Sequence, residues 1–265
     1  MKKLLAMVMC VCLAVMFTAC GKGKDQSDSE YVKEKGKLVI GITDYAPMDY
    51  EKTKGSGEWI GFDADMAKAF AKELGVEAEF VVIEWDNKLM ELKGKSIDCV
   101  WNGMTITDEV KNGMEVSNAY CKNTQVVVVK KDVADKYKTI ESVKDLKFAA
   151  EAGSAGEKAL KDLGYSVTAV GAQSDALMEV NAGTSDAAVI DLLMAGAMIG
   201  EGTSYENLAY TVGVADEEDF GVGFRKGSDL TEAFNNFYKG AYKDGIVLSF
   251  AQKYGVQEAI VDPEA

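Results

Sequence analysis

Carboxylate and hydroxyl side chains follow the ends of two apolar runs in the second half of the chain. Asp191 closes the run at residues 187–190, and Glu151 precedes a short glycine-containing segment that includes Ser154. The carboxylate of Asp191 can meet a ligand ammonium group, or it can serve as the N-cap of the helix that follows. Ser154 lies three residues before Glu157, which is the spacing of a capping box, and the free N–H groups at such a helix start form an anion site. These positions predict polar ligand contacts, with plain helix capping as the alternative.

Amides and hydroxyls also follow a run in the first half of the chain. Residues 102–109, Asn-Gly-Met-Thr-Ile-Thr-Asp-Glu, leave a strand-like run with small polar residues and then enter a helical pattern. Ligands of open α/β sheets bind outside the carboxyl ends of the strands. Asn102, Gly103 and Thr105 are therefore candidate ligand contacts, and an ordinary turn with N-capping threonines is the alternative.

Aromatic residues follow two further apolar runs. Tyr45 and Met48 come after the run at 38–42, and Trp85 comes after the run at 80–83. Packing in the core is the alternative for each of them. Five strand ends that carry ligand-type residues are more persuasive together than singly, and together they predict one binding site.

The elements that would position these residues alternate along the chain. The clearest helix spans residues 61–75, where Phe62, Met66, Phe70 and Leu74 recur every four residues. Strands that alternate with helices predict largely parallel sheets covered on both faces. Besides the runs at 38–42 and 80–83, the predicted strands are 97–101, 125–129, 148–151, 167–170, 187–190 and 220–224, and the other predicted helices are 89–92, 154–163, 174–182, 230–243 and 246–254.

Composition excludes several classes of function. The chain has 265 residues, of which 48% are hydrophobic and 27% charged, which indicates a globular protein. A net charge of −14 argues against a nucleic-acid partner, because nucleic-acid binding depends on clustered Lys and Arg. Histidine is absent, which excludes His-based triads and most transition-metal sites. We therefore predict neither a metal nor a cofactor.

The N-terminus has the pattern of an export signal. Two lysines precede an apolar run at residues 4–17, and small residues with Cys20 close it. The run is shorter than the roughly 20 residues of a membrane span. A cysteine at this point resembles the lipobox of bacterial lipoproteins, so we predict a signal peptide at 1–19, a lipid on Cys20 and a polar tether at 20–34. An ordinary signal peptide with a chance cysteine is the alternative. The prediction places the protein outside the cytoplasm, lipid-anchored to the bacterial cell membrane.

The other four cysteines lie in two parts of the chain. Cys10 and Cys12 lie within the predicted signal peptide, whereas Cys99 and Cys121 lie beyond it. An exported protein can hold a disulfide between such residues. Cys99 lies in an apolar run that reads as a buried strand, so two buried thiols are our prediction and a disulfide is the alternative.

Several segments resemble the family 3 solute-binding proteins, which serve polar amino-acid ABC transporters. The most specific are Gly-Phe-Asp-Ala-Asp at 61–65 and Gly-Met-Thr-Ile-Thr at 103–107, and a weaker one is 221–227. The likeness covers residues 38–255 in order and spacing. It implies an α/β, periplasmic-binding-protein-like (type II) fold, in which two α/β lobes are joined by two crossover strands with the ligand cleft between them.

The resemblance also implies boundaries and a function. Lobe 1 would comprise residues 35–124 and 220–265, lobe 2 residues 125–219, and the crossovers would lie near 123–130 and 211–224. A monomer would capture a small amino acid or cationic amine by lobe closure and deliver it to an ABC permease and its ATPase, without enzymatic activity. A tethered ligand sensor is one alternative. A dehydratase-like enzyme on the same scaffold, with Glu151 and Asp191 as acid and base, is another.

The chain departs from the family pattern at two carboxylate contacts. In the family, an arginine three residues after the second threonine of the Thr-Ile-Thr motif clamps the ligand's α-carboxylate, and that position here is Val110. A threonine usually follows the serine of the Gly-Ser segment, and here it is Ala155. Asp191, where the family binds the α-ammonium, is kept, and Glu151 falls where the family often has an apolar residue. The residues predicted to contact the ligand are Tyr45, Met48, Trp85, Asn102, Gly103, Thr105, Val110, Glu151, Ser154, Ala155 and Asp191.

These departures predict an altered ligand. Truncating one partner of a buried charged pair costs ~2–5 kcal/mol, or at least ~30-fold in affinity. We therefore expect a ligand that is cationic overall, or an amine without a conventional α-carboxylate site, which Trp85 and Tyr45 could face through cation–π contacts. The competing expectation is that the carboxylate survives, held by the helix start at Ser154 and by Lys111.

Overall fold

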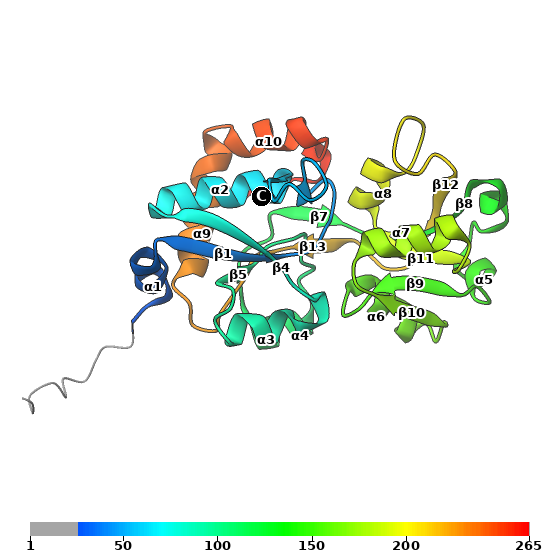
Figure 1. Ribbon diagram of the computed structural model, residues 1–265, viewed down its shortest axis with the longest axis horizontal. Coiled ribbons are helices and arrows are strands. Elements are labelled where there is room, and N and C mark those ends of the chain that lie inside the picture. The colour runs from blue at the N-terminus through cyan, green and yellow to red at the C-terminus, as the bar shows by residue number, and fades with distance from the viewer. Residues whose placement is uncertain (1–25, 265) are drawn as a thin grey trace, which may run out of the picture.

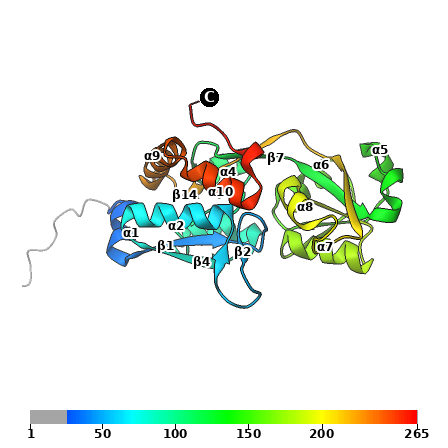
Figure 2. The same cartoon turned by 90° about the horizontal axis from the view of Figure 1, so that it is seen from above.

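The computed structural model describes residues 26–264, so the predicted signal peptide and Cys20 lie outside the described residues. Within 26–264 the chain forms two α/β lobes that lie side by side (Figures 1 and 2). No helix in this part of the chain is both long enough and apolar enough to cross a membrane.

The first lobe is built on a five-stranded sheet. Its central strand β1 pairs in parallel with β4 and β5, whereas β14 runs antiparallel to β5 and β6. In spatial order the strands are β4 (Glu77–Val82), β1 (Lys37–Ile42), β5 (Cys99–Val100), β14 (Gly223–Phe224) and β6 (Glu115–Val116).

Helices cover both faces of this sheet because β1 alternates its side chains between them. Leu38 and Ile40 belong to the cluster with α2, α9 and α10, whereas Val39 belongs to the cluster with α3 and α4 (Figure 1). The helices of this lobe are α1 (Asp28–Lys35), α2 (Phe62–Leu74), α3 (Lys88–Lys93), α4 (Asp108–Gly113), α9 (Leu230–Lys243) and α10 (Ile246–Tyr254), and a hairpin is formed by β2 (Tyr50–Glu51) and β3 (Trp59–Ile60).

The second lobe repeats the plan with another five-stranded sheet. Strands β9, β10 and β11 are parallel, and β8 runs antiparallel to β11 and β12. In spatial order they are β10 (Val167–Val170), β9 (Phe148–Glu151), β11 (Ala187–Asp191), β8 (Gln125–Lys130) and β12 (Leu208–Gly213), and the helices are α5 (Ile140–Val143), α6 (Ala155–Asp162), α7 (Gln173–Ala182) and α8 (Leu192–Met198). The described chain also contains three 3₁₀ turns, at Trp85–Asn87, Lys131–Lys136 and Gln257–Ala259.

Two short strands join the lobes. Strand β7 (Cys121–Asn123) leaves the first lobe, and β13 (Glu218–Phe220) returns to it. They pair with each other in antiparallel fashion, with Asn123 opposite Glu218. The chain therefore passes between the lobes twice at one place, close to the predicted crossovers, and we keep 35–124 with 220–265 and 125–219 as the proposed division.

Two details of the predicted sheets are corrected by this arrangement. The sheets are mixed rather than largely parallel, because β8, β12 and β14 adjoin the crossovers and run against their neighbours. The predicted strand at 220–224 is two strands, since Phe220 pairs with Cys121 whereas Phe224 pairs with Cys99 in the main sheet. Both differences follow from pairing between segments distant in sequence.

The predicted tether is shorter than residues 20–34. Helix α1 begins at Asp28, because Ser27 and Glu30 form a capping box at its start. Val32 of this helix is fully buried in the core of the first lobe. Residues from Asp28 onward therefore belong to the folded lobe.

Both cysteines of the described chain are buried thiols without a disulfide, as predicted. Cys99 lies in β5 and Cys121 in β7. Burial raises the pKa of each thiol above its ordinary value, which keeps both in the unreactive protonated form.

The single arginine of the chain ties three separate segments together. The guanidinium of Arg225 donates to both carboxylate oxygens of Asp28 at 3.0 Å, to the carbonyl of Ile97 at 2.8 Å and to Asp98 at 3.2 Å. Asp98 is fully buried and also accepts from the ammonium of Lys35 at 2.5 Å. Arg225 therefore fixes α1 to the sheet and lies away from the cleft.

Arg225→Lys is expected to lower the free energy of unfolding by about 2 kcal/mol, because an ammonium cannot reproduce the forked contacts to Asp28 and Ile97. Urea unfolding followed by circular dichroism measures the change. The control is Lys226→Ala, which removes an exposed neighbouring cation and should leave the midpoint unchanged. Equal midpoints for wild type and Arg225→Lys would contradict the assigned role.

Candidate functional site

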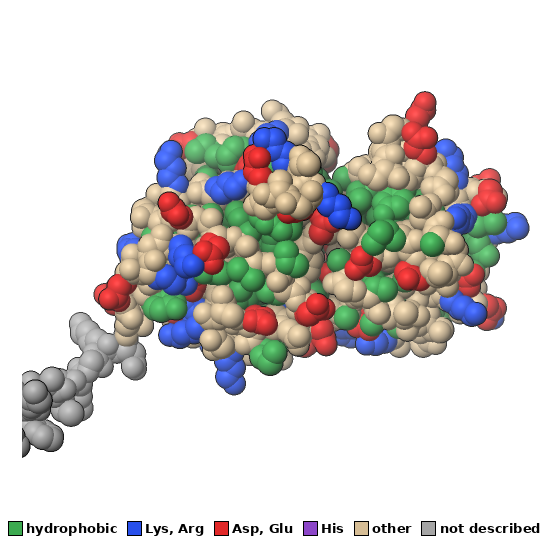
Figure 3. All heavy atoms as spheres, in the orientation of Figure 1, with side chains coloured by type: hydrophobic (Ala, Val, Ile, Leu, Met, Phe, Trp, Pro, Cys, Tyr) green, Lys and Arg blue, Asp and Glu red, His purple; other side chains and the backbone are tan. Residues whose placement is uncertain are grey.

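A cavity of about 300 Å³ lies between the two lobes. Both lobes contribute loops that follow the carboxyl ends of their strands, which is where ligands bind in open α/β sheets. Figure 3 shows acidic side chains on both sides of the line where the lobes meet. The cavity is lined by Trp85, Asp86, Lys88, Asn102, Gly103, Met104, Thr105, Thr107, Glu109, Val110, Gln125, Glu151, Gly153, Ser154, Ala155, Glu157, Lys158, Lys161, Asp162, Gln173 and Asp191.

Most of the predicted contact residues line this one cavity. The first lobe brings Trp85, Asn102, Gly103, Thr105 and Val110, and the second lobe brings Glu151, Ser154, Ala155 and Asp191. Segments from two separate regions of the sequence, 85–110 and 151–191, thus converge because the strand ends of both sheets face each other across the junction.

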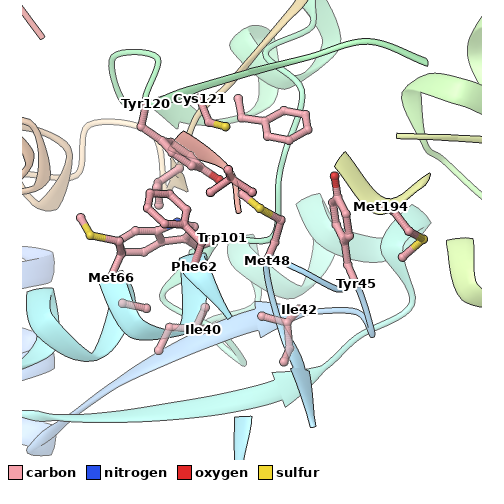
Figure 4. Packing of buried hydrophobic residues seen from close by; sticks show 14 of the residues in the cluster. Ile40, Ile42, Tyr45, Met48, Phe62, Met66, Trp101, Tyr120, Cys121 and Met194 are labelled. Atoms are coloured by element: carbon pink, nitrogen blue, oxygen red, sulfur yellow. The ribbon is translucent and has the colours of Figure 1, made fainter. Parts of the chain in front are cut away.

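Met48 was predicted to contact the ligand, but its side chain lies in the core. Its carbonyl accepts the N–H groups of Asp63 at 3.0 Å and Ala64 at 3.2 Å, which fixes the segment on the start of α2. The side chain is fully buried in the cluster that contains Phe62 and Tyr120 (Figure 4). Core packing, the alternative that the sequence left open, holds for Met48.

Tyr45 is buried at the junction without lining the cavity. Its ring lies beside Met194 of the second lobe (Figure 4). Burial, and then the negative charge of Asp191, raise the pKa of the Tyr45 phenol well above its ordinary value. Gly103 packs against the same ring with a positive φ of 56°, and a Cβ there would lie 2.6 Å from the Tyr45 ring.

Asp191 is held by amide groups rather than acting as a helix cap. Its Oδ1 accepts from the side chains of Asn123 and of Gln125, the latter at 2.6 Å, and its Oδ2 accepts from the Gln173 side chain. No side-chain bond from Asp191 caps α8. Burial raises the pKa of Asp191 to about 7, while the hydrogen bond from Gln173 opposes the rise. The carboxylate is therefore fixed in place and ready for a cationic partner.

Glu218 adds a third acid that the sequence did not single out. Its Oε2 accepts from Gln125 at 2.9 Å and from the Thr105 hydroxyl at 3.2 Å. Burial raises its pKa above the ordinary value. Gln125 donates to both Asp191 and Glu218. Because Glu218 also accepts from Thr105, these hydrogen bonds connect the acids of the site to the first lobe.

Glu151 faces the cavity with an unused oxygen. The side chain is only 2% exposed, and its Oε1 has no hydrogen-bond partner in the described part of the chain. Burial raises the pKa of Glu151 to about 8, and the charge of Asp191 contributes to the rise. The group is therefore mainly protonated at neutral pH, and a bound cation would favour its ionised form.

Ser154 caps α6 and makes one of the two hydrogen bonds of the predicted capping box. Its hydroxyl oxygen accepts the N–H of Glu157 at 3.1 Å. The Glu157 carboxylate accepts the N–H of Gly153 at 3.0 Å instead of the N–H of Ser154. These two hydrogen bonds fix the turn before α6, and Gly153, Ser154 and Ala155 of this turn and helix start line the cavity.

Two buried acids, Asp49 and Asp63, hold the loop at 102–105 through hydrogen bonds. The Asn102 side chain donates to Asp49 at 2.8 Å, and the N–H of Gly103 donates to Asp63 at 2.7 Å. The hydroxyl of Tyr120 donates to the same oxygen of Asp63. Burial raises the pKa of both acids. The side chain of Asn102 is therefore engaged in holding the loop. Gly103 and Thr105 remain the main candidates for ligand contact from this loop.

Lys88 is the most important cavity residue that sequence reasoning missed. It is only 8% exposed, and its ammonium lies 5.0 Å from the centre of the Trp85 ring. Lys88 precedes the buried Leu92 by four residues, so the two share one face of a helix. The sequence signal that could have identified Lys88 is its place on the same helix face as an apolar residue. Lys111, by contrast, is exposed and outside the cavity.

Residues 26–264 contain no group of three or more His, Cys, Asp or Glu side chains arranged to hold a metal ion. Two acids of the junction, Asp191 and Glu218, instead accept hydrogen bonds from side-chain amides. What the arrangement offers is recognition: fixed carboxylates, a buried ammonium, an aromatic face and the N–H groups of a helix start.

The family model for bacterial extracellular solute-binding proteins, family 3, matches residues 38–257. The chain belongs to this family. The match spans both lobes and the cavity between them, so it accounts for the whole described fold except its first helix and last residues. The predicted type II periplasmic-binding-protein-like architecture is confirmed, and members of this family act outside the cytoplasm.

The arginine-binding extracellular protein ArtP of Bacillus subtilis (strain 168) is 31% identical over 262 residues, which cover 96% of this chain and 98% of that protein. An amino acid ABC transporter substrate-binding protein from Streptococcus pneumoniae, solved with L-arginine, has a TM-score of 0.78 at 30% identity over 86% of this chain and 98% of that one. The ancestral amino acid-binding protein AncCDT-1, described as a precursor of cyclohexadienyl dehydratase, has a TM-score of 0.77 at 33% identity over 86% and 99% of the two chains.

The buried acids predict an unusual pH dependence of stability. Between pH 4.5 and 8 Glu151 is protonated when folded and ionised when unfolded, so folding takes up a proton. Its contribution is fully present below pH 4.5 and is lost as pH rises through 8, at up to about 1.4 kcal/mol per pH unit. The chain has no histidine to mask the effect. We expect the unfolding free energy to increase when pH falls from 8 to 6.

Urea unfolding at several pH values measures this slope in wild type and in Glu151→Gln, which should be flatter by about one proton. Glu109→Gln, which alters an exposed glutamate lining the same cavity, is the matched control and should keep the wild-type slope. A wild-type stability that increases from pH 6 to 8 would contradict the assignment.

Proposed function

We propose that this protein captures an amino acid or a related amine between its lobes and delivers it to an ABC permease, while a lipid on Cys20 holds it at the membrane. The observation that carries the proposal is the cavity of about 300 Å³ at the junction, where Asp191 and Glu151 of one lobe face Trp85 and Thr105 of the other. Carboxylates recognise an ammonium, and the aromatic face accommodates the rest of a small ligand.

Closure of the lobes is the proposed mechanism. The paired strands β7 and β13 form the connection between lobes in the described chain, so rotation about them would open and close the cavity. Ligand contacts from both lobes stabilise the closed form, and the permease with its ATPase would receive the ligand from that form. The relatives named for arginine binding support an amino acid as the ligand class.

We propose binding without catalysis, although one observation favours a second candidate. The likeness to a precursor of cyclohexadienyl dehydratase, together with the unpartnered Oε1 of Glu151, fits a dehydratase-like acid on the same scaffold. Recovery of the bound solute unchanged after prolonged incubation would support the binding protein, and conversion of that solute would support the enzyme.

Asp191→Asn should weaken ligand binding at least ~30-fold, because it removes the charged partner of a buried ammonium. A thermal-shift screen of the common amino acids, polyamines and quaternary amines identifies the ligand, and titration calorimetry measures its affinity. Asp162→Asn, a change at the exposed rim of the same cavity, is the control and should leave affinity within about twofold. Unchanged affinity in Asp191→Asn would contradict ammonium binding there.

Cys20→Ser should release the protein from the membrane fraction and abolish its metabolic labelling with a fatty acid. Cys12→Ser alters a cysteine inside the predicted signal peptide and should leave both properties unchanged. Retention of label in Cys20→Ser would overturn the lipid anchor.

A further inference from the structure

The cavity contains one buried cation without an acidic partner. The ammonium of Lys88 donates to the carbonyl of Trp85 at 3.2 Å and to the carbonyl of Gly153 at 3.0 Å. In the described chain no carboxylate lies within 4.0 Å of it, so no ion pair forms. The other lysines of the cavity, Lys158 and Lys161, are exposed and paired with acids on their own helix.

A buried cation of this kind is costly unless an anion approaches it. Transfer of a charged group out of water without a partner is strongly unfavourable, and carbonyl dipoles offset only part of the cost. Burial lowers the pKa of Lys88 for this reason, while the more distant charges of Glu109, Glu151 and Asp86 oppose the shift. An anionic group of a ligand beside the ammonium would supply the direct partner that it lacks.

A second group of anion-binding donors lies beside the ammonium. Gly153, which accepts from Lys88, directly precedes the N-cap of α6. Among residues 26–264, the N–H groups of Ala155 and Gly156 at the start of α6 have no hydrogen-bond acceptor. Helix N-termini carry partial positive charge and bind carboxylates through such N–H groups. The lysine and the helix start therefore present positive charge to the same part of the cavity.

We propose that Lys88 and the start of α6 bind the carboxylate of the ligand, while Asp191 binds its ammonium. The proposal rests on the proposed function and narrows the ligand to a zwitterionic amino acid rather than a carboxylate-free amine. Val110, which lines the same cavity without charge, leaves Lys88 as the buried cation available for this contact.

The arrangement also couples ligand binding to closure. Lys88 comes from the first lobe, whereas Gly153 and α6 come from the second. A Cβ on Gly153 would lie 2.7 Å from the Cα of Asp86, so glycine is what allows the two lobes to approach here. A carboxylate at this point contacts both lobes at once and stabilises their closed arrangement.

Three pairs of compounds test the proposal by titration calorimetry: L-arginine with agmatine, L-histidine with histamine, and L-lysine with cadaverine. In each pair the amine lacks only the carboxylate. Wild type should bind at least one amino acid more than tenfold tighter than its amine. Lys88→Met should weaken binding of that amino acid at least ~30-fold and leave binding of its amine nearly unchanged, which removes the preference.

Lys93→Met is the matched control, since it removes an exposed lysine of the same helix that does not line the cavity, and it should keep the wild-type preference. Equal binding of amino acid and amine by wild type would overturn the proposal without any variant. An undiminished preference in Lys88→Met would also overturn it, while leaving the proposed function intact. Failure of wild type to bind any of the six compounds or any other common amino acid would count against the proposed function itself, and against the proposal that rests on it.

Discussion

The removal of acidic side chains from water where the two lobes meet is the constraint on which the site depends. Glu151, Asp191 and Glu218 are all withdrawn from solvent there, and each must be protonated, hydrogen-bonded or opposed by a cation. The side-chain amides around Asp191 meet this demand directly, and Gln125 serves two acids at once. Lys88 is the opposite case, because its buried ammonium forms no ion pair with a carboxylate of the described chain. A ligand with both charges would satisfy the two sides of the junction together.

Much of the secondary structure could be read from periodicity and apolar runs. The strands at 148–151 and 167–170 and the helices at 230–243 and 246–254 occupy the predicted residues, because local pattern and burial agree there. The direction of β8 and the division of 220–224 could not be read, because both depend on pairing with distant segments. The helix at Asp28 was available as the capping pattern of Ser27 and Glu30 but was assigned to the tether.

The candidate site was predictable where a strand end carries a polar residue, as at Thr105, Glu151 and Asp191, all of which line the cavity. The aromatic run at Tyr45 and Met48 was less informative, because an apolar side chain after a strand can turn either to the core or to the ligand. Lys88 escaped notice because one lysine in a helical pattern usually points to solvent. Only its burial and its contact with Gly153 of the second lobe show that this lysine is enclosed.

The fixing of α1 by Arg225 determines which lobe the N-terminal segment is joined to. Helix α1 lies at the end of the first lobe that is remote from the second (Figure 1), and its contacts with Arg225 and Asp229 belong wholly to the first lobe. A lipid on Cys20 would therefore attach the protein to the membrane through its first lobe, and closure would swing the second lobe relative to that attached one. The orientation of that swinging lobe, rather than a change within the anchored one, would then signal occupancy to a membrane partner.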